Sequence, residues 1–384
     1  MKIAINTTSA VTGGGVTYIK NLLAHLSEAT SPHQYLVLTT ISGKQMFNIP
    51  HPNFKFLSFK IPLRSPLLRL CWEQIVLPVF LKREGVDMLF SPANICPLFT
   101  KITNVIMIQN VEPFGNSVSI ERGVSQILRL KLLKLLTILS IKKAKKVVFP
   151  STKARNDVEK SGILLKHAEV IYHGINKELF RSCVENSVAH QIKKKYGLDK
   201  FIFYASNIQR YKGFLELAKA FVSLRDKIDN KVQLVFAGMC LDKRYYDEVK
   251  AFVAREGYEN RVIFLGNIPY EELPYLYSTC MMFIYPSTCE SFGMPLIEAM
   301  ACGAPILASN VEPMTEICAD AAVYFDPKNP HEMADAMLKV MTDQALIATL
   351  KMNSLKRATM FSWETAISKT LHIFETEFRN YRLK

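Results

Sequence analysis

Short apolar runs alternate with stretches of helical periodicity along the first half of the chain. Runs with the length of one buried strand occur at residues 2–6, 35–39, 54–59, 86–90, 105–109 and 147–149. Apolar residues spaced three or four positions apart predict helices after the glycines at 13–15, at residues 67–82 and at residues 121–146. Strands that alternate with helices predict a parallel sheet covered on both faces. The first half is therefore expected to form a doubly wound α/β domain.

The second half shows the same alternation. Strand-length runs occur at residues 201–205, 233–238, 262–266, 281–285, 305–309 and 322–325. Helical periodicity returns at residues 331–341 and 345–360, and Phe361-Ser-Trp363-Glu364 opens a last helix. A chain of 384 residues is expected to form two domains, because single cores rarely grow beyond about 250–300 residues. We expect these domains at residues 1–185 and 186–360, followed by a C-terminal helix at 361–384.

The densest candidate chemistry lies in residues 285–310. Apolar residues 281–285 predict a strand, and the small and polar residues 287–293 predict a loop. Residues 294–301 then predict a helix that ends at Gly303. A strand, a loop and a helix in this order place backbone N–H groups and the positive end of a helix at a binding crevice.

Two acids belong to this stretch, Glu290 in the loop and Glu298 in the helix. Carboxylates accept hydrogen bonds from hydroxyl groups and repel phosphate, so both could face one ligand at the sugar parts of a nucleotide sugar. The phosphates are then expected at the amides of Phe292, Gly293 and Met294. The alternative is a helix with an ordinary serine cap and two solvated acids.

The residues around the two acids carry a family resemblance. Pro286-Ser287, Glu290-Ser-Phe-Gly-Met-Pro-Leu-Ile-Glu298, Ala299-Met-Ala-Cys-Gly303 and Pro305 together resemble the donor-site signature of glycosyltransferase family 4, the glycosyl transferases group 1. The resemblance implies a retaining enzyme of the GT-B fold. Its two Rossmann-like domains would face each other across a cleft, and the last helix would cross back onto the first domain. It also implies that Glu290 contacts the donor sugar, that Glu298 holds the ribose, and that Leu296 belongs to the donor site.

The resemblance extends to three further places on the donor side. An arginine and a lysine commonly hold the donor diphosphate in this family, and Lys212 matches the lysine. Asn207 stands where the arginine is usual, and Arg210 replaces it only if the loop turns its side chain inward. Gly14 and Gly15 occupy the place of the glycine loop that borders the pyrophosphate and the acceptor. A surface lysine and a plain strand-to-helix turn are the alternatives.

Two departures from the family pattern affect the proposed chemistry. Many members have His-Asp where this chain has Gln109-Asn110, and an amide cannot act as a general base. Asn110 is therefore expected either to guide a substrate through hydrogen bonds or to serve a structural turn. His173 stands in a His-Gly pair where Asn-Gly is usual, and we favour a turn role for it.

Positive charge is concentrated in the first half of the chain. Residues 1–185 contain 24 Lys and Arg against 11 Asp and Glu, which is +13 of the total +14. Such an excess indicates an anionic partner, either nucleic acid, an anionic bilayer or a charged acceptor. The sequence has no zinc spacing, RNA-binding signature or convincing helix-turn-helix, so nucleic acid is not expected.

Residues 121–146 form the most basic part of this half, with eight Lys and Arg against one acid. Leucine and isoleucine occupy most of the helix circumference, so we expect much of it to be buried. The competing interpretation is a membrane-facing helix, in which each basic group near anionic lipid contributes roughly 1 kcal/mol. Its candidate contacts with a membrane or an acceptor are Lys142, Lys143, Lys145 and Lys146.

Composition and targeting signals suggest where the protein works. An apolar content of 49% with 21% charged residues fits an ordinary soluble protein. The N-terminus lacks the apolar core of a signal peptide, and no stretch approaches the roughly 20 apolar residues of a membrane span. Eight cysteines without a C-x-x-C pair suit reduced thiols. We expect a cytoplasmic protein that is peripheral on the inner face of the membrane.

These observations together predict a hexosyltransferase that uses a nucleotide-diphosphate sugar and no cofactor. No two aspartates stand two positions apart, so no Asp-x-Asp is available for a metal, and we expect metal-independent transfer. The expected catalytic residues are Glu290, Lys212 and Asn110. The expected acceptor is a saccharide or a lipid-linked saccharide in bacterial surface polysaccharide assembly, whether lipopolysaccharide, O-antigen or capsule. A non-catalytic GT-B binding subunit and a sugar-nucleotide epimerase or hydrolase remain as alternatives.

Overall fold

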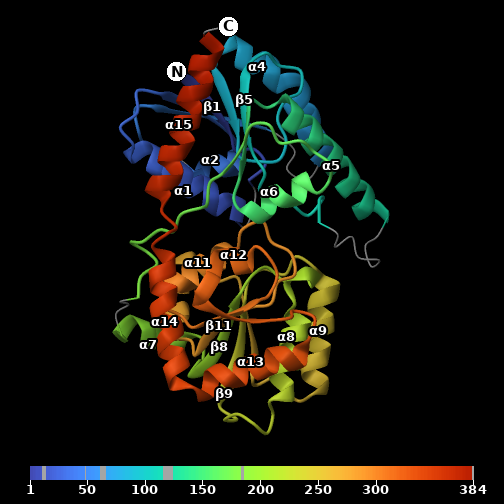
Figure 1. Ribbon diagram of the computed structural model, residues 1–384, viewed down its shortest axis with the longest axis vertical. Coiled ribbons are helices and arrows are strands. Elements are labelled where there is room, and N and C mark those ends of the chain that lie inside the picture. The colour runs from blue at the N-terminus through green and yellow to red at the C-terminus, as the bar shows by residue number, and fades with distance from the viewer. Residues whose placement is uncertain (11–13, 48, 61–65, 116–123, 183–185, 383–384) are drawn as a thin grey trace. The chain divides into compact units, whose positions relative to one another are not determined.

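The computed structural model describes residues 1–10, 14–47, 49–60, 66–115, 124–182 and 186–382. The chain divides into two compact units, unit 1 with Met1–Gly174 and Ser362–Lys384, and unit 2 with Ile175–Phe361. Figure 1 shows each unit as a sheet with helices on both faces. Two parallel-sheet α/β domains were predicted, and this is confirmed. The division falls at Gly174, ahead of the expected boundary at residue 185.

The sheet of unit 1 is parallel throughout its described strands and has the order β3-β2-β1-β4-β5-β6-β7. Its strands are β1 (Lys2–Asn6), β2 (Gln34–Thr40), β3 (Phe54–Phe59), β4 (Met88–Ser91), β5 (Thr103–Met107), β6 (Lys146–Phe149) and β7 (Ala168–Val170). The chain order reverses between β1 and β4. Side chains alternate across the sheet, so Ile3 and Ile5 face one core and Ala4 faces another.

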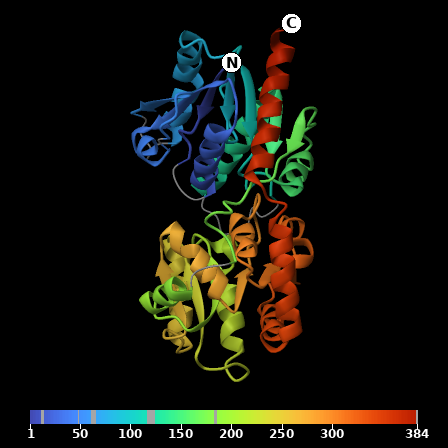
Figure 2. The same ribbon diagram turned by 90° about the vertical axis from the view of Figure 1, so that its left-hand side faces the viewer.

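The helices of unit 1 cover both faces of its sheet (Figure 1). They are α1 (Gly14–Glu28), α2 (Ile41–Phe47), α3 (Pro66–Cys71), η1 (Trp72–Val76), α4 (Leu77–Arg83), α5 (Val124–Lys143), α6 (Thr152–Glu159) and α15 (Trp363–Arg382). The last helix, α15, packs beside α1 and against β5, as Figures 1 and 2 show. Trp363 and Phe374 of α15 are fully buried in the same core as Ile3. The C-terminal segment therefore completes a core that the first residues begin.

One predicted helix, at residues 67–82, is interrupted in the structure. The segment η1 is a turn of π-helix between α3 and α4, and it contains the buried Glu73. Oε1 of Glu73 accepts hydrogen bonds from the Thr8 hydroxyl at 3.1 Å, in the turn after β1, and from the amide of Asn6, the last residue of β1, at 3.4 Å. The spacing of apolar residues does not reveal this π-helix, because its wider turn occurs together with hydrogen bonds to residues that are distant in the sequence.

The sheet of unit 2 is also parallel in its described strands, in the order β10-β9-β8-β11-β12-β13. Its strands are β8 (Lys200–Ala205), β9 (Val232–Ala237), β10 (Val262–Gly266), β11 (Met282–Tyr285), β12 (Ile306–Ser309) and β13 (Ala322–Phe325). Its helices are α7 (Asn186–Lys195), η2 (Arg210–Lys212), α8 (Phe214–Ser223), α9 (Lys243–Arg255), η3 (Tyr270–Glu272), α10 (Leu273–Thr279), α11 (Met294–Ala301), α12 (Met314–Cys318), η4 (Ala319–Ala321), α13 (Pro330–Thr342) and α14 (Gln344–Ala358).

Candidate active site

The candidate site lies where two neighbouring strands of unit 2 end. Strands β8 and β11 pair directly, and the chain order reverses between them. Open α/β sheets bind ligands outside the carboxyl ends of their strands at such a point. The loops after the two strands meet there, because the Thr288 N–H donates to the Tyr211 carbonyl oxygen at 2.9 Å. A glycine is needed at this contact: Gly213 has a φ of 72°, and a Cβ on it would lie 2.7 Å from the Pro286 carbonyl oxygen.

An ion pair joins the two loops. Nζ of Lys212 lies 2.5 Å from Oε1 of Glu290, and their side chains are only 10% and 13% exposed. The Tyr285 hydroxyl donates to the same oxygen at 2.7 Å. The ring centroids of Tyr211 and Tyr285 lie 5.1 and 5.8 Å from the ammonium group. The structure thus brings together two predicted residues that come from opposite sides of the reversal point.

The loop that carries Glu290 leads directly into α11. The N-cap residue of α11 is Gly293, with a φ of 102°, so no side-chain hydrogen bond caps the start of this helix. The alternative of a serine-capped helix start is therefore not what the structure contains. The Leu296 N–H donates to the Gly293 carbonyl oxygen at 3.0 Å, and the Leu296 side chain is fully buried. Phe292 is also buried, whereas Met294 begins the first turn of α11.

Glu298 belongs to a different hydrogen-bond network from Glu290. Its carboxylate accepts the Tyr270 hydroxyl at 2.8 Å on Oε1 and the Tyr277 hydroxyl at 3.1 Å on Oε2. Burial raises the pKa of Glu298 to about 7, although the two tyrosine donors act in the opposite direction. That both acids face one ligand remains a prediction, because no hydrogen bond links the two networks within the described residues.

Asn207, which stands where the arginine is usual, and Arg210, its possible replacement, both have partners within unit 2. Arg210 contacts Glu248 of α9 at 2.6 Å and lies 4.9 Å from the ring centroid of Tyr245, and 47% of its side chain is exposed. The Asn207 side chain accepts the Met239 N–H at 3.3 Å. These contacts direct Arg210 toward α9 and leave Lys212 as the cation that contacts Glu290.

In unit 1, Asn94 holds the Gln109-Asn110 pair through hydrogen bonds. The Asn94 side chain accepts the N–H groups of Gln109 and Asn110 at 3.1 and 2.9 Å, and it donates to the Asn110 carbonyl oxygen at 2.6 Å. The Asn110 side chain accepts the Glu112 N–H at 2.9 Å, which is a local turn contact. A Cβ on Gly15 would lie 3.8 Å from Oε1 of Gln109. Nothing lies within 4 Å of the corresponding position on Gly14, and Gly13 lies outside the described residues.

His173 is part of the core of unit 1. Its ring centroid lies 4.8 Å from that of Tyr18 and 6.1 Å from that of Trp363. Burial lowers the pKa of His173 to about 3, so its imidazole is uncharged at neutral pH. The structure gives this residue a packing role.

Helix α5 exposes a stripe of leucines that only the membrane-facing interpretation of the sequence would leave outside the core. The leucine stripe consists of Leu128, Leu132, Leu135 and Leu139, with exposed fractions of 67%, 39%, 54% and 38%. The expectation that much of α5 is buried does not hold on this face, and the competing membrane-facing interpretation stays a prediction. Lys142, Lys143 and Lys145 are exposed near the end of the helix, but Lys146 belongs to β6 and contacts Glu169 at 2.9 Å. None of the helices in the described ranges has the length and apolar content to span a bilayer.

Family models match both halves of the chain. The model for glycosyl transferases group 1 matches residues 186–357, and the model for glycosyltransferase family 4 matches residues 12–179. The chain belongs to glycosyltransferase family 4. The resemblance inferred from the residues around Glu290 is thereby confirmed, while the retaining mechanism stays a prediction.

Two mannosyltransferases of Escherichia coli match part of the chain. O-antigen chain mannosyltransferase B of Escherichia coli is 29% identical over 187 residues, which are 48% of this chain and 48% of that protein. A serotype-specific mannosyltransferase of Escherichia coli is 30% identical over 173 residues, or 45% of this chain and 21% of that protein. The chain thus spans about half, or less, of the length of these relatives.

Solved structures match nearly the whole chain. Anabaena HepE in complex with UDP-glucose has a TM-score of 0.78 at 20% identity, covering 98% of this chain and 100% of that one. WaaG, a glycosyltransferase involved in lipopolysaccharide biosynthesis, has a TM-score of 0.78 at 16% identity, covering 97% and 99%. At such identities the likeness shows the fold alone, and the GT-B fold predicted for this family 4 chain is confirmed.

Sequence reasoning missed four polar side chains that form hydrogen bonds with residues of the candidate site. They are Tyr270, Tyr277, Tyr285 and Asn94. A tyrosine at the end of an apolar strand or within a short helix has the pattern of a core residue, so its hydroxyl partner is not predictable from periodicity. Asn94 offered one signal, since an asparagine follows a buried strand at the edge of the sheet where ligands bind.

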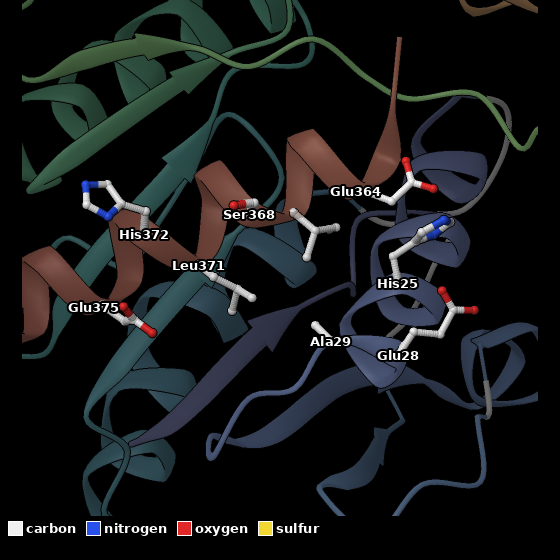
Figure 3. Close-up of a pocket in the computed structure, with 9 residues that line it drawn as sticks. His25, Glu28, Ala29, Glu364, Ser368, Leu371, His372 and Glu375 are labelled. Carbon is white, nitrogen blue, oxygen red and sulfur yellow. The ribbon is translucent and has the colours of Figure 1, made fainter. Parts of the chain in front are cut away.

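A separate groove of about 460 Å³ lies between α1 and α15. Figure 3 shows His25 and Glu28 on α1, facing the groove with Glu364, His372 and Glu375 on α15. No predicted site residue lines it, and its acids would repel a diphosphate. Within the described residues no three His, Cys, Asp or Glu side chains gather as metal ligands, and metal independence stays a prediction.

Proposed function

We propose that this chain transfers a hexosyl group, with retention and without a metal ion, from a nucleotide-diphosphate sugar to a saccharide or lipid-linked acceptor. The proposal places the reaction in the assembly of bacterial surface polysaccharide, whether lipopolysaccharide, O-antigen or capsule. The observation that carries it is the poorly exposed ion pair of Lys212 and Glu290 at the reversal point of the unit 2 sheet. Membership of family 4 and the match to an O-antigen mannosyltransferase support the choice of reaction and setting.

Lys212 would stabilise the charge that develops on the leaving diphosphate. Its ammonium group has three N–H donors, of which one points to Glu290, so two remain for phosphate oxygens. A fixed donor of this kind contributes roughly 2.7–4 kcal/mol to the transition state, by analogy with a single oxyanion-hole donor. The amides at the start of α11, next to Gly293, add the positive end of the helix dipole.

The two acids would bind the uncharged parts of the donor. Oε1 of Glu290 is occupied by Lys212 and Tyr285, and among the described residues Oε2 accepts no hydrogen bond. That free oxygen suits a hydroxyl of the donor sugar. Glu298 is proposed to accept a ribose hydroxyl while it keeps its contacts with the two tyrosines. A structure of a relative with UDP-glucose supports a nucleotide sugar as the donor class.

Asn110 is proposed to guide the acceptor rather than to move a proton. Its amide is not a base, and its position is fixed through the hydrogen bonds of Asn94. Gln109 lies beside Gly15 at the same edge of the unit 1 sheet. The proton of the attacking hydroxyl would then pass to an oxygen of the leaving phosphate.

Donor turnover by the purified protein tests the proposal. UDP-glucose and GDP-mannose are offered with saccharide and lipid-linked acceptors, and the anomeric configuration of the product is read by NMR, with and without EDTA. We expect transfer with retention that EDTA does not affect. Lys212→Ala should lower kcat about 10²–10³-fold. Lys243→Ala, which removes an exposed lysine paired with Asp247, is the matched control and should leave it unchanged.

The alternatives predict different products. Nucleotide binding without turnover across the acceptors would favour a binding subunit. Release of free sugar or of an epimer without an acceptor would favour a hydrolase or an epimerase. An inverted product would reject retention and leave the transferase assignment intact.

We also propose that α5 binds the anionic inner face of the cell membrane. The leucine stripe has the spacing of one helix face, and Arg129, Lys131, Lys142 and Lys143 are exposed beside it. An apolar face next to basic groups suits a bilayer interface with anionic lipid. The positive excess of residues 1–185 supports the same partner.

Vesicle sedimentation tests this contact with phosphatidylglycerol and with phosphatidylcholine alone. The wild type should sediment with the anionic vesicles. Replacing Lys142, Lys143 and Lys145 by Gln should weaken binding on the order of 100-fold, at about 1 kcal/mol per basic group. Leu128→Gln with Leu135→Gln should weaken it as well. Leu241→Gln, which changes an exposed leucine in unit 2, is the control, and equal sedimentation of all variants would reject the membrane contact.

A further inference from the structure

The Glu290 carboxylate accepts a hydrogen bond from the hydroxyl of Tyr285, the last residue of β11. Resting on the proposed function, we propose that Tyr285 is a positioning residue. Its hydroxyl holds one carboxylate oxygen of Glu290 in a hydrogen bond within the protein, so that the other oxygen is available to accept a hydroxyl of the donor sugar. Tyr285 would thus act on sugar binding through Glu290, without touching the nucleotide.

Tyr285 itself is held rigidly. It is 1% exposed, and its ring meets that of Tyr204 edge-on with centroids 5.7 Å apart. The Tyr204 hydroxyl donates to the Lys212 carbonyl oxygen at 2.8 Å. Two packed tyrosines from neighbouring strands therefore anchor both ends of the ion pair, one at the Lys212 backbone and one at the Glu290 carboxylate.

Glu290 depends on such a contact because its own backbone does not fix it. It lies in the loop between β11 and α11, outside any helix or strand. Lys212 has a long, flexible side chain and a nondirectional charge, so attraction to it alone would allow the carboxylate to rotate. The Tyr285 hydroxyl adds a directional hydrogen bond to the same oxygen at 2.7 Å.

The hydroxyl of Tyr285 stays a donor over the working pH range. Burial, followed by the charge of Glu290, raises the pKa of Tyr285 well above its ordinary value. The proton therefore remains on the tyrosine, and the oxygen that faces it on Glu290 remains an acceptor. The orientation of the carboxylate is preserved before the donor arrives, which lowers the cost of ordering it on binding.

A purely structural tyrosine would behave differently from a positioning one. Tyr285→Phe keeps the ring and removes only the hydroxyl. Tyr35→Phe is the matched control, because Tyr35 is 2% exposed and its hydroxyl contacts Ser31 at 3.2 Å in unit 1. Thermal unfolding of both variants measures the loss of a buried hydroxyl as such.

The test measures by calorimetry how tightly the protein binds each nucleotide sugar and the corresponding free nucleotide. The two pairs are UDP-glucose and UDP, and GDP-mannose and GDP. Tyr285→Phe should weaken binding of the nucleotide sugar about tenfold, as one hydrogen bond to a charged group allows, and should not change binding of the free nucleotide. Tyr35→Phe should change neither. In a Glu290→Gln background, Tyr285→Phe should add less than about a twofold loss, because its partner charge is already gone.

Two results would overturn the proposal. One is an unchanged affinity of Tyr285→Phe for the nucleotide sugar. The other is an equal loss from Tyr285→Phe with and without Glu290→Gln, which would mean that the tyrosine acts independently of the carboxylate. Failure of the proposed function is separable, since a wild type that binds the nucleotide sugar and transfers nothing still reports on Tyr285 through binding.

Discussion

Glu290 and Glu298 have the same side chain and opposite surroundings. Glu290 is 13% exposed, and its carboxylate contacts the ammonium group of Lys212. Glu298 is 4% exposed and contacts two phenol groups, without a cation among its contacts. Its pKa of about 7 places the loss of its charge within the physiological range. Of the two acids in the motif, Glu298 is therefore the one for which we predict a pH dependence.

Binding of the nucleotide sugar should weaken as the pH falls below about 7. The raised pKa means that Glu298 is charged above that pH and protonated below it, and the protonated form is a weaker acceptor. If only the charged form binds, the dissociation constant rises by at most about tenfold per pH unit. Calorimetric titrations between pH 5.5 and 8.5 measure this. Glu298→Gln should flatten the profile, and an unaltered profile in that variant would assign the pH dependence to another group.

Elements of the site are joined by backbone geometry that only a few residues adopt. The loops after β8 and β11 touch at Gly213, whose positive φ follows directly on Lys212. The same principle explains the start of α11, where Gly293 takes a positive φ and turns the chain from the Glu290 loop into the helix. A side chain at either position would move the acid or the lysine, because each is only a few residues away.

Gly213→Ala should destabilise unit 2 and weaken donor binding. Strain at positive φ costs about 1–2 kcal/mol, and the contact with the Pro286 carbonyl oxygen adds to it. Gly257→Ala is the control, since Gly257 has the same φ of 72° and nothing within 4 Å of its Cβ position. Urea unfolding should show a larger loss for Gly213→Ala than for Gly257→Ala. Equal losses of unfolding free energy in the two variants would mean that the contact between Gly213 and the Pro286 carbonyl oxygen does not contribute to the stability of unit 2.

At the scale of the whole chain, unit 1 is assembled from two distant segments. Residues 362–384 return to unit 1 after the chain has built unit 2. Trp363 is 1% exposed, and its ring lies near Tyr18, His25 and His173. Gly174 must be glycine at this crossing, because a Cβ on it would lie 2.2 Å from the Trp363 backbone nitrogen. The two chain crossings between the units therefore pack against each other.

Trp363→Ala should lower the free energy of unfolding of unit 1 by about 3–5 kcal/mol, the usual cost of emptying a buried tryptophan site. The chain has two tryptophans, and the remaining Trp72 also belongs to unit 1, so its fluorescence follows this unit. Urea unfolding monitored at Trp72 should shift to lower concentration. Met352→Ala, at an exposed position of α14, should not shift it. A loss below about 1 kcal/mol would mean that α15 is not needed for the core of unit 1.

The sequence by itself determined the class of the fold and the composition of the motif. Periodicity of apolar residues reflects which faces are buried, so it predicted the alternation of strands and helices, including those around β8, β11 and α11. The choice of Glu290 and Glu298 followed from a local pattern, because the residues of α11 and its loop are close in sequence, and the choice of Lys212 followed from a separate match to the family pattern. The π-helix at Glu73 was not predicted, and the sequence left open whether the leucines of α5 are buried or exposed, since a pattern of apolar residues does not show what packs against each face.

Only the tertiary structure decided which side chains meet. Lys212 and Glu290 are 78 residues apart, and they pair because β8 and β11 are neighbours in the sheet. Pairing of parallel strands is set by the packing of the whole unit and leaves no trace in the spacing of either loop. The same holds for the tyrosines that hold Glu290 and Glu298, whose rings follow the apolar pattern of the core while their hydroxyls find partners from other elements.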